Sequence, residues 1–297
     1  MARLLWTQKQ GFGPSPRLSH VLAFDSNRSR VVMFGGITGI GAKEVLADDT
    51  WEWDGENWTQ VEDIGPSARK WFAAAYDRNR KRLVLYGGLT ASGAASGETW
   101  EWDGQDWTQV SETGPSARVL HAMAFDINKN VVTLFGGQQE QTVLNDTWEW
   151  NGQDWTQQED RGPNRSMHAM AYDDSRKRLV LFGGADAHFQ EQGDTWEWDG
   201  TRWTQRTDFG PPACSNPCLV FTIVECVLFG GTHGGLVPQK QTWTWDGTYW
   251  TARQDMGPSA RSGHAAAFDS VRQRVVLFGG IDQKQSLLGD TWEQNVL

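Results

Sequence analysis

Short apolar stretches alternate with turn residues along the whole chain, without the 3.6-residue period of an amphipathic helix. In the last such unit, a strand of small residues is expected over 264–269 (HAAAFD), followed by a short turn. A continuous apolar run over 274–280 (RVVLFGG) is typical of a strand buried on both faces. A variable loop then leads to a third strand at 291–294 (TWEQ). The pattern predicts an all-β chain of short strands.

A distinctive turn joins the third and fourth strands of the units. The pattern Trp-Asp-Gly-x-x-Trp occurs at 53–58, 102–107, 198–203 and 245–250. Asp-Gly is a strong hairpin signal because both residues tolerate positive φ. The last Trp of the pattern begins the fourth strand, so each unit is expected to contain four antiparallel strands.

The unit recurs six times, at intervals of 47 to 52 residues. Gly-Pro pairs begin at 13, 65, 114, 162, 210 and 257. Aromatic-Gly-Gly triplets begin at Phe34, Tyr86, Phe135, Phe182, Phe229 and Phe278. A Trp preceded by Thr stands at 51, 100, 148, 196, 243 and 292. Such a period indicates a repeat architecture in which each repeat is one structural unit.

The two ends of the chain complement each other. The sixth unit stops after its third strand, at 291–297 (TWEQNVL), and the segment 4–10 (LLWTQKQ) aligns with 57–63 (NWTQVED). We therefore expect the N-terminal strand to complete the sixth unit and to close a ring without free edges. The expectation is one complete domain over 1–297, with units at 13–63, 64–112, 113–160, 161–208, 209–255, and 256–297 plus 3–10.

The units resemble kelch repeats over essentially the whole chain. The resemblance rests on the six Gly-Gly pairs, the spaced Trp residues and the pattern Arg-x-x-His at 17–20, 118–121, 165–168 and 261–264. It implies a six-bladed β-propeller with one repeat per blade, in which the first strand of each blade lines a central channel. It also implies that the loops before the first strand and after Gly-Gly share the face where ligands usually bind.

The 18 Trp residues are mostly explained by the repeats. Large aromatic side chains fill the wide outer part of the wedge between blades, so we interpret the repeated Trp residues as structural. Trp71 alone is outside the pattern. It occupies the position that other repeats give to Ser19, Leu120, Met167, Asn216 and Gly263. It is either a stacking platform for a ligand or a plug of the channel.

Five repeats place an arginine after the Gly-Pro turn: Arg17, Arg69, Arg118, Arg165 and Arg261. These residues could form a cationic ring that captures an anion. Alternatively, each could pair with a third-strand glutamate: Glu52, Glu101, Glu149, Glu197 or Glu293. The fifth repeat carries Cys214 and Thr244 instead of both partners. This joint loss favours the structural pair, because a lone buried charge is costly.

Histidine and cysteine provide the candidates for chemistry. Four innermost strands begin with His20, His121, His168 and His264, which could bind a metal or transfer protons, although such repeat positions more often bond backbone or water. Cys214 should lie near Arg165, Arg261 and His264, where positive charge could make it a nucleophile, unless it is an ordinary buried thiol. His188 and His233, in variable loops, are candidates for specificity. We expect no metal site and no cofactor.

Charge and hydropathy restrict the partners. The net charge is −10 and there is no run of Lys or Arg, which argues against nucleic acid and anionic membranes. No stretch approaches the roughly 18 apolar residues of a membrane span or resembles a signal peptide. The simplest expectation is a cytoplasmic monomer.

Three functions are compatible with these features. The first is a binding module for a peptide, a glycan or an anionic small molecule. Its face would combine loops 37–48, 89–97, 138–145, 185–193, 232–240 and 281–289 with Lys70, Trp71, Arg118, Ser166, Asn216 and Ser262 at the channel mouth. The second is a cofactor-independent isomerase or epimerase, lyase or cyclase with its pocket at the mouth, similar by fold alone to the kelch sialic-acid epimerases. The third is a structural assembly unit.

Overall fold

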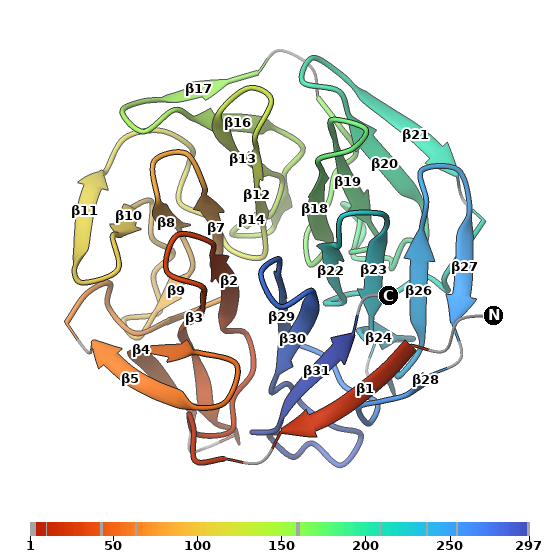
Figure 1. Ribbon diagram of the computed structural model, residues 1–297. Helices are drawn as coiled ribbons and strands as arrows, with labels where there is room; N and C mark the ends of the chain where they lie inside the picture. Colours follow the sequence, from red (N-terminus) through yellow and green to blue (C-terminus); the bar gives the residue numbers. More distant parts are fainter. Residues whose placement is uncertain are drawn as a thin grey trace.

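The computed structural model describes residues 4–9, 11–41, 44–62, 64–158, 161–207, 209–235, 237–253 and 255–295. Their regular elements are all strands, and six small antiparallel sheets stand around a central axis as a six-bladed propeller (Figure 1). No helix in these ranges is long and apolar enough to cross a membrane. The predicted all-β, six-bladed fold is confirmed.

The first five blades each consist of four strands, which follow one another from the innermost to the outermost. The first contains β2 (Val21–Asp25), β3 (Arg30–Gly39), β4 (Val45–Trp53) and β5 (Trp58–Glu62). The second contains β7 (Ala73–Asp77), β8 (Arg82–Tyr86), β10 (Thr99–Trp102) and β11 (Trp107–Ser111). The third contains β12 (Ala122–Asp126), β13 (Val131–Phe135), β16 (Thr147–Trp150) and β17 (Trp155–Gln157). The fourth contains β18 (Ala169–Asp173), β19 (Arg178–Phe182), β20 (Thr195–Trp198) and β21 (Trp203–Thr207). The fifth contains β22 (Cys218–Phe221), β23 (Cys226–Phe229), β26 (Thr242–Trp245) and β27 (Trp250–Arg253).

The sixth blade joins the two ends of the chain. It contains β29 (Ala265–Asp269), β30 (Arg274–Phe278), β31 (Thr291–Asn295) and the N-terminal β1 (Leu4–Lys9). β1 pairs antiparallel with β31, with Trp6 opposite Gln294, and β28 (Asp255–Met256) adds a short parallel contact to β1. The expected closure of the ring by the N-terminal strand is confirmed.

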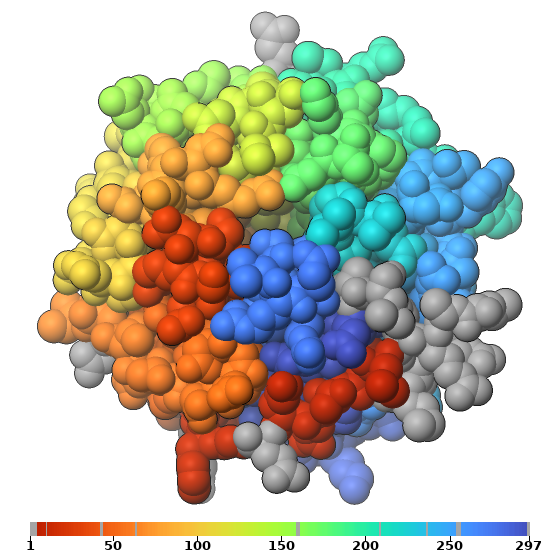
Figure 2. All heavy atoms as spheres, viewed as in Figure 1, coloured from red at the N-terminus to blue at the C-terminus, as the bar shows by residue number. Residues whose placement is uncertain are grey.

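The propeller has two distinct faces. The turn face carries the turns between first and second strands, at 26–29, 78–81, 127–130, 174–177, 222–225 and 270–273. The loop face carries the Gly-Pro segments and the loops that follow Gly-Gly. Three of these loops include two-stranded ribbons, namely β6 (Arg69–Lys70) with β9 (Leu89–Thr90), β14 (Gln138–Gln139) with β15 (Thr142–Val143), and β24 (Thr232–His233) with β25 (Val237–Pro238). Figure 2 shows the turn face, with the turns after β2 (red), β22 (cyan) and β29 (blue) crowded near its centre.

The outer Trp of each blade explains the Gly-Pro pairs. The indole of Trp107 donates a hydrogen bond of 2.9 Å from Nε1 to Oγ1 of Thr50 in the preceding blade. The same ring lies against Gly65, where a Cβ atom would be only 2.6 Å from Cδ1 of Trp107. All six Gly-Pro glycines meet an outer Trp of their own blade in this way. The repeated Trp residues are therefore part of the contact between blades, as the sequence indicated.

Gly65→Ala should lower the free energy of unfolding by about 1–3 kcal/mol, because the added methyl overpacks the indole of Trp107. Gly11→Ala is the matched control, since its Cβ would approach nothing closer than 3.9 Å and its φ is not positive. The control should change stability by no more than about 0.5 kcal/mol. Urea unfolding followed by Trp fluorescence measures both, and equal stabilities would contradict the packing account.

Candidate functional site: the central channel

The loop-face end of the channel is closed by a ring of backbone. One residue per blade adopts a left-handed conformation with φ between 52° and 62°: Ser19, Trp71, Leu120, Met167, Asn216 and Gly263. Amides of this ring donate to carbonyls of the preceding blade, as Met167 N does to Leu120 O at 2.9 Å. The cavity left at this end is only about 120 Å³. The hydrogen-bonded backbone of this ring leaves little room for a ligand at the loop-face end of the channel.

Trp71 lies in this ring, at the position that the repeat alignment gave it. Its side chain is half-buried, and the ammonium of Lys70 stands 4.3 Å above the ring centroid. Lys70 in turn forms an ion pair of 2.7 Å with Glu44. One face of the indole is therefore already occupied by a cation from its own chain.

The other loop-face candidates are dispersed. Lys70, Arg118, Ser166 and Ser262 are buried, and Asn216 is half-buried. His188 and His233 are exposed on the loops of blades four and five. His233 Nδ1 lies 2.7 Å from the carbonyl oxygen of Ala213, so a local backbone contact holds this imidazole.

The five arginines of the Arg-x-x-His position are buried structural groups. Arg17, Arg69, Arg118 and Arg261 are at most 1% exposed, and Arg165 is also buried. Arg17 binds both carboxylate oxygens of Asp49, at 2.6 and 2.9 Å, and donates to the carbonyl of Gly35 at 3.0 Å. Burial acts to raise the pKa of Asp49, but the hydrogen bonds from Arg17 and Trp51 outweigh it and hold the pKa below its usual value.

The prediction that these arginines pair with the third-strand glutamates was wrong. The carboxylates they bind stand directly before Thr-Trp: Asp49, Glu98, Asp146, Asp194 and Asp290. The expected partners lie three residues further along the third strand, towards the turn face, where they bind other cations. Four of these cations lie in the turns, and Arg274 begins β30. These pairs are Glu52 with Arg28, Glu101 with Arg80, Glu149 with Lys129, Glu197 with Arg176, and Glu293 with Arg274. Occupied in this way, the arginines do not form a cationic ring open to ligands.

The fifth repeat still supports the structural interpretation. It has Cys214 in place of the Arg and Gln241 in place of the carboxylate that the Arg would bind. The joint loss therefore holds for the corrected partner. Cys214 itself is buried, and burial, together with the nearby Glu191 carboxylate, raises the pKa of its thiol to about 12. Of the two alternatives for Cys214, the structure favours the ordinary buried thiol, because burial and the Glu191 carboxylate both oppose formation of the thiolate.

The four inner histidines pack between blades. His121 meets Tyr86 of the preceding blade edge-on, with ring centroids 5.7 Å apart. In the second repeat, Phe72 takes the same position and meets Phe34 with the same separation. A phenyl ring thus serves where other blades use imidazole. Burial lowers the pKa of His121, His168 and His264 to about 3 and that of His20 well below its usual value. Buried and neutral at pH 7, these residues are poorly suited to proton transfer.

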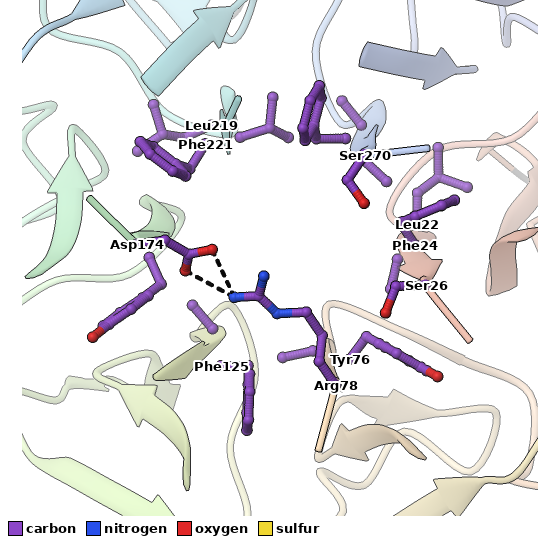
Figure 3. A pocket seen from close by; sticks show the side chains of 18 of the residues that line it. Leu22, Phe24, Ser26, Tyr76, Arg78, Phe125, Asp174, Leu219, Phe221 and Ser270 are labelled. Carbon is purple, nitrogen blue, oxygen red and sulfur yellow. Dashed lines mark hydrogen bonds and ion pairs between the residues drawn. The ribbon is translucent and has the colours of Figure 1, made fainter. Parts of the chain in front are cut away.

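A larger cavity of about 540 Å³ opens on the turn face, opposite the face expected from the sequence. Its deeper wall is an aliphatic layer with one residue per blade: Leu22, Ala74, Met123, Met170, Leu219 and Ala266. Nearer the mouth is an aromatic layer: Phe24, Tyr76, Phe125, Tyr172, Phe221 and Phe268. Figure 3 labels four of these residues, namely Phe24, Tyr76, Phe125 and Phe221. The rim consists of Ser26, Arg78, Asp174, Ser175, Ile223 and Ser270. The sequence contained a signal for the aromatic layer, since each first strand has an aromatic residue at or next to its last position.

An ion pair crosses the mouth of this cavity. Arg78, in the turn after β7, reaches past blade three to Asp174, in the turn after β18 (Figure 3). Its Nη2 lies 2.8 Å from each carboxylate oxygen of Asp174. The same turn position holds Ser26, Ile127, Ile223 and Ser270 in the other repeats. Sequence reasoning missed this pair, which a comparison of that single position across the six repeats would have revealed.

Metal-binding geometry and likeness to known proteins complete the description. Within the described ranges, no group of three or more His, Cys, Asp or Glu residues is arranged to hold a metal ion. No known protein-family model matches the chain, and no curated protein matches its sequence. Function is therefore inferred from the geometry of the channel.

His121→Phe should reduce the loss of stability that occurs as the pH falls. A histidine whose pKa is about 3 when folded and about 6.5 when unfolded contributes stability that is complete above pH 6.5 and lost as the pH falls. Between about pH 7.5 and about pH 5, the variant should lose about 2 kcal/mol less than the wild type. Phe72→His should steepen the fall. Urea unfolding at the two pH values measures this, and unchanged slopes would contradict the assignment of buried, neutral imidazoles.

Proposed function

We propose that the chain is a kelch-type propeller that binds a small, largely apolar ligand in its central channel, entered from the turn face. The observation that carries this proposal is the cavity of about 540 Å³ with its complete aromatic layer. Small-molecule sites are typically concave, mostly apolar and about 300–1,000 Å³ in volume, with a few polar groups that orient the ligand. The channel matches these criteria in shape and volume, and most of its lining residues are apolar, with Arg78, Asp174 and the serines at the rim.

The turn face is favoured over the loop face by the space available. The loop-face cavity is about 120 Å³ and is bounded by the left-handed backbone ring. The arginines expected to attract a ligand there are buried and bound to carboxylates. A ligand on that face would be limited to the exposed parts of the loops.

A second hollow on the protein surface is less suitable. It measures about 690 Å³, lies between blades six and one, and is lined mainly by charged side chains of both signs. Lys9 and Arg274 each lie 3.1 Å from the carboxylate of Glu293. Charges that already neutralise one another in an open, polar hollow provide little surface for an apolar ligand.

Binding is favoured over catalysis by the chemistry of the channel lining. Arg78 and Asp174 are the charged residues that line the cavity, and they are paired with each other. The candidates for acid–base and nucleophilic chemistry are the inner histidines, with lowered pKa values, and Cys214, with a raised pKa. General acid–base catalysis is most efficient when the pKa of the group lies near the working pH.

The proposal is tested with N-phenyl-naphthylamine, a neutral fluorophore of aromatic rings. The wild type should bind one equivalent with increased fluorescence. Ala74→Met combined with Ala266→Met should weaken binding by at least about tenfold, because the longer side chains fill the aliphatic layer. Repeats three and four carry Met at this position, so the variant should retain its fold.

Trp71→Ala is the matched control on the loop face and should leave the affinity unchanged within about twofold. Thermal unfolding checks that each variant is folded. Two results would contradict the proposal. One is the absence of saturable binding by the wild type. The other is that the Ala74→Met, Ala266→Met double variant binds the probe as well as the wild type, while Trp71→Ala loses affinity.

A further inference from the structure

Arg78 has unused donors that are open to solvent, unlike the buried arginines at the loop-face end of the channel. Nη2 makes both hydrogen bonds to Asp174, and no other hydrogen bond of this guanidinium is present among the described residues. Arg17, by contrast, uses Nε, Nη1 and Nη2 in bonds to Ser15, Gly35 and Asp49. Figure 3 shows the Arg78 guanidinium reaching into the middle of the opening. It is a cation placed at the entrance with free N–H groups.

The ion pair with Asp174 is easily exchanged. The side chain of Arg78 is 37% exposed and that of Asp174 is 35% exposed. Ion pairs exposed to this extent contribute little, so displacing Asp174 would cost a ligand at most about fivefold in affinity. A guanidinium fork matches carboxylate and sulfonate oxygens in geometry, and an incoming anion can therefore replace the Asp174 carboxylate.

The opposite side of the mouth is apolar. Ile223 of blade five, which lines the rim, is 54% exposed. Phe221 and Leu219 continue this surface into the cavity. The inner hairpin of blade five is shorter than the others, because β22 and β23 have only four residues each. Its turn, closed by a hydrogen bond from Thr222 N to Glu225 O, presents Ile223 at the rim. The mouth thus combines one cation with an apolar wall across from it.

We propose that the ligand is an amphipathic anion, with its apolar part between the aromatic residues of the channel and its acidic group on Arg78. Asp174 is an internal competitor that occupies the guanidinium when the channel holds no anion. This inference rests on the proposed function and adds the class of ligand and the residue that selects it. The acidic group can be a carboxylate, sulfonate or phosphate, since all three present the oxygens that Arg78 can bind.

Two probes with the same ring system separate the two proposals. N-phenyl-naphthylamine is neutral, whereas anilinonaphthalenesulfonate adds a sulfonate to the same rings. Arg78→Gln should weaken the sulfonate probe by about tenfold and leave the neutral probe within about twofold. Asp174→Asn should strengthen the sulfonate probe by up to about fivefold and also leave the neutral probe unchanged. Arg202→Gln, at an exposed arginine of the turn face outside the channel, is the control and should alter neither.

Opposite shifts from the two variants are the signature of a competitor, because a merely structural ion pair would make both variants behave alike. If both variants weaken the sulfonate probe, or neither changes it, while the neutral probe still binds, the role of Arg78 is overturned and the channel site survives. If the neutral probe fails to bind the wild type, the proposed function and this inference are both overturned.

Discussion

The structure depends on the close approach of successive blades. Aromatic and histidine side chains can lie at these contacts because glycine residues stand opposite them. At the inner end, a Cβ on Gly87 would lie 2.9 Å from Cε1 of His121 in the next blade. At the outer end, each Gly-Pro glycine makes room for an outer Trp of its own blade, and the indole of Trp107 in turn donates to Thr50 of the preceding blade. Glycine at both ends lets the blades pack as wedges, and the six inner strands then surround a channel of fixed width. The dimensions of the proposed ligand site follow from this packing.

The six repeats share one backbone conformation, and the differences between their side chains give the cavity its chemistry. The aliphatic layer is interrupted by Ala74 and Ala266, which give the cavity its volume near blades two and six. At the mouth, the repeats place a cation and an anion at the same turn position in blades two and four. The shortened hairpin of blade five places the apolar Ile223 at the rim. Each departure from symmetry on the turn face thus has a physical consequence for a ligand in the channel.

The fold was predictable because its signals are local and repeated. Gly-Gly, Gly-Pro and the Trp spacing each recur in every blade, and the split sixth blade follows from aligning the two ends. The site was harder to predict from the sequence. Asp49 and Glu52 are acidic residues of one strand, and only their positions along it decide that Arg17 binds the first. Arg78 and Asp174 are 96 residues apart and meet across the ring rather than between neighbouring blades. Attention to the Arg and His repeats therefore pointed to the loop face, where these groups are buried.

A crystal structure of the protein in complex with anilinonaphthalenesulfonate tests the central claim most directly. The account predicts the rings of the probe within the aromatic layer and its sulfonate on the guanidinium of Arg78, with the Asp174 carboxylate turned away. A probe bound instead beside Trp71 on the loop face, or in the charged hollow between blades six and one, would contradict the assignment of the channel as the ligand site.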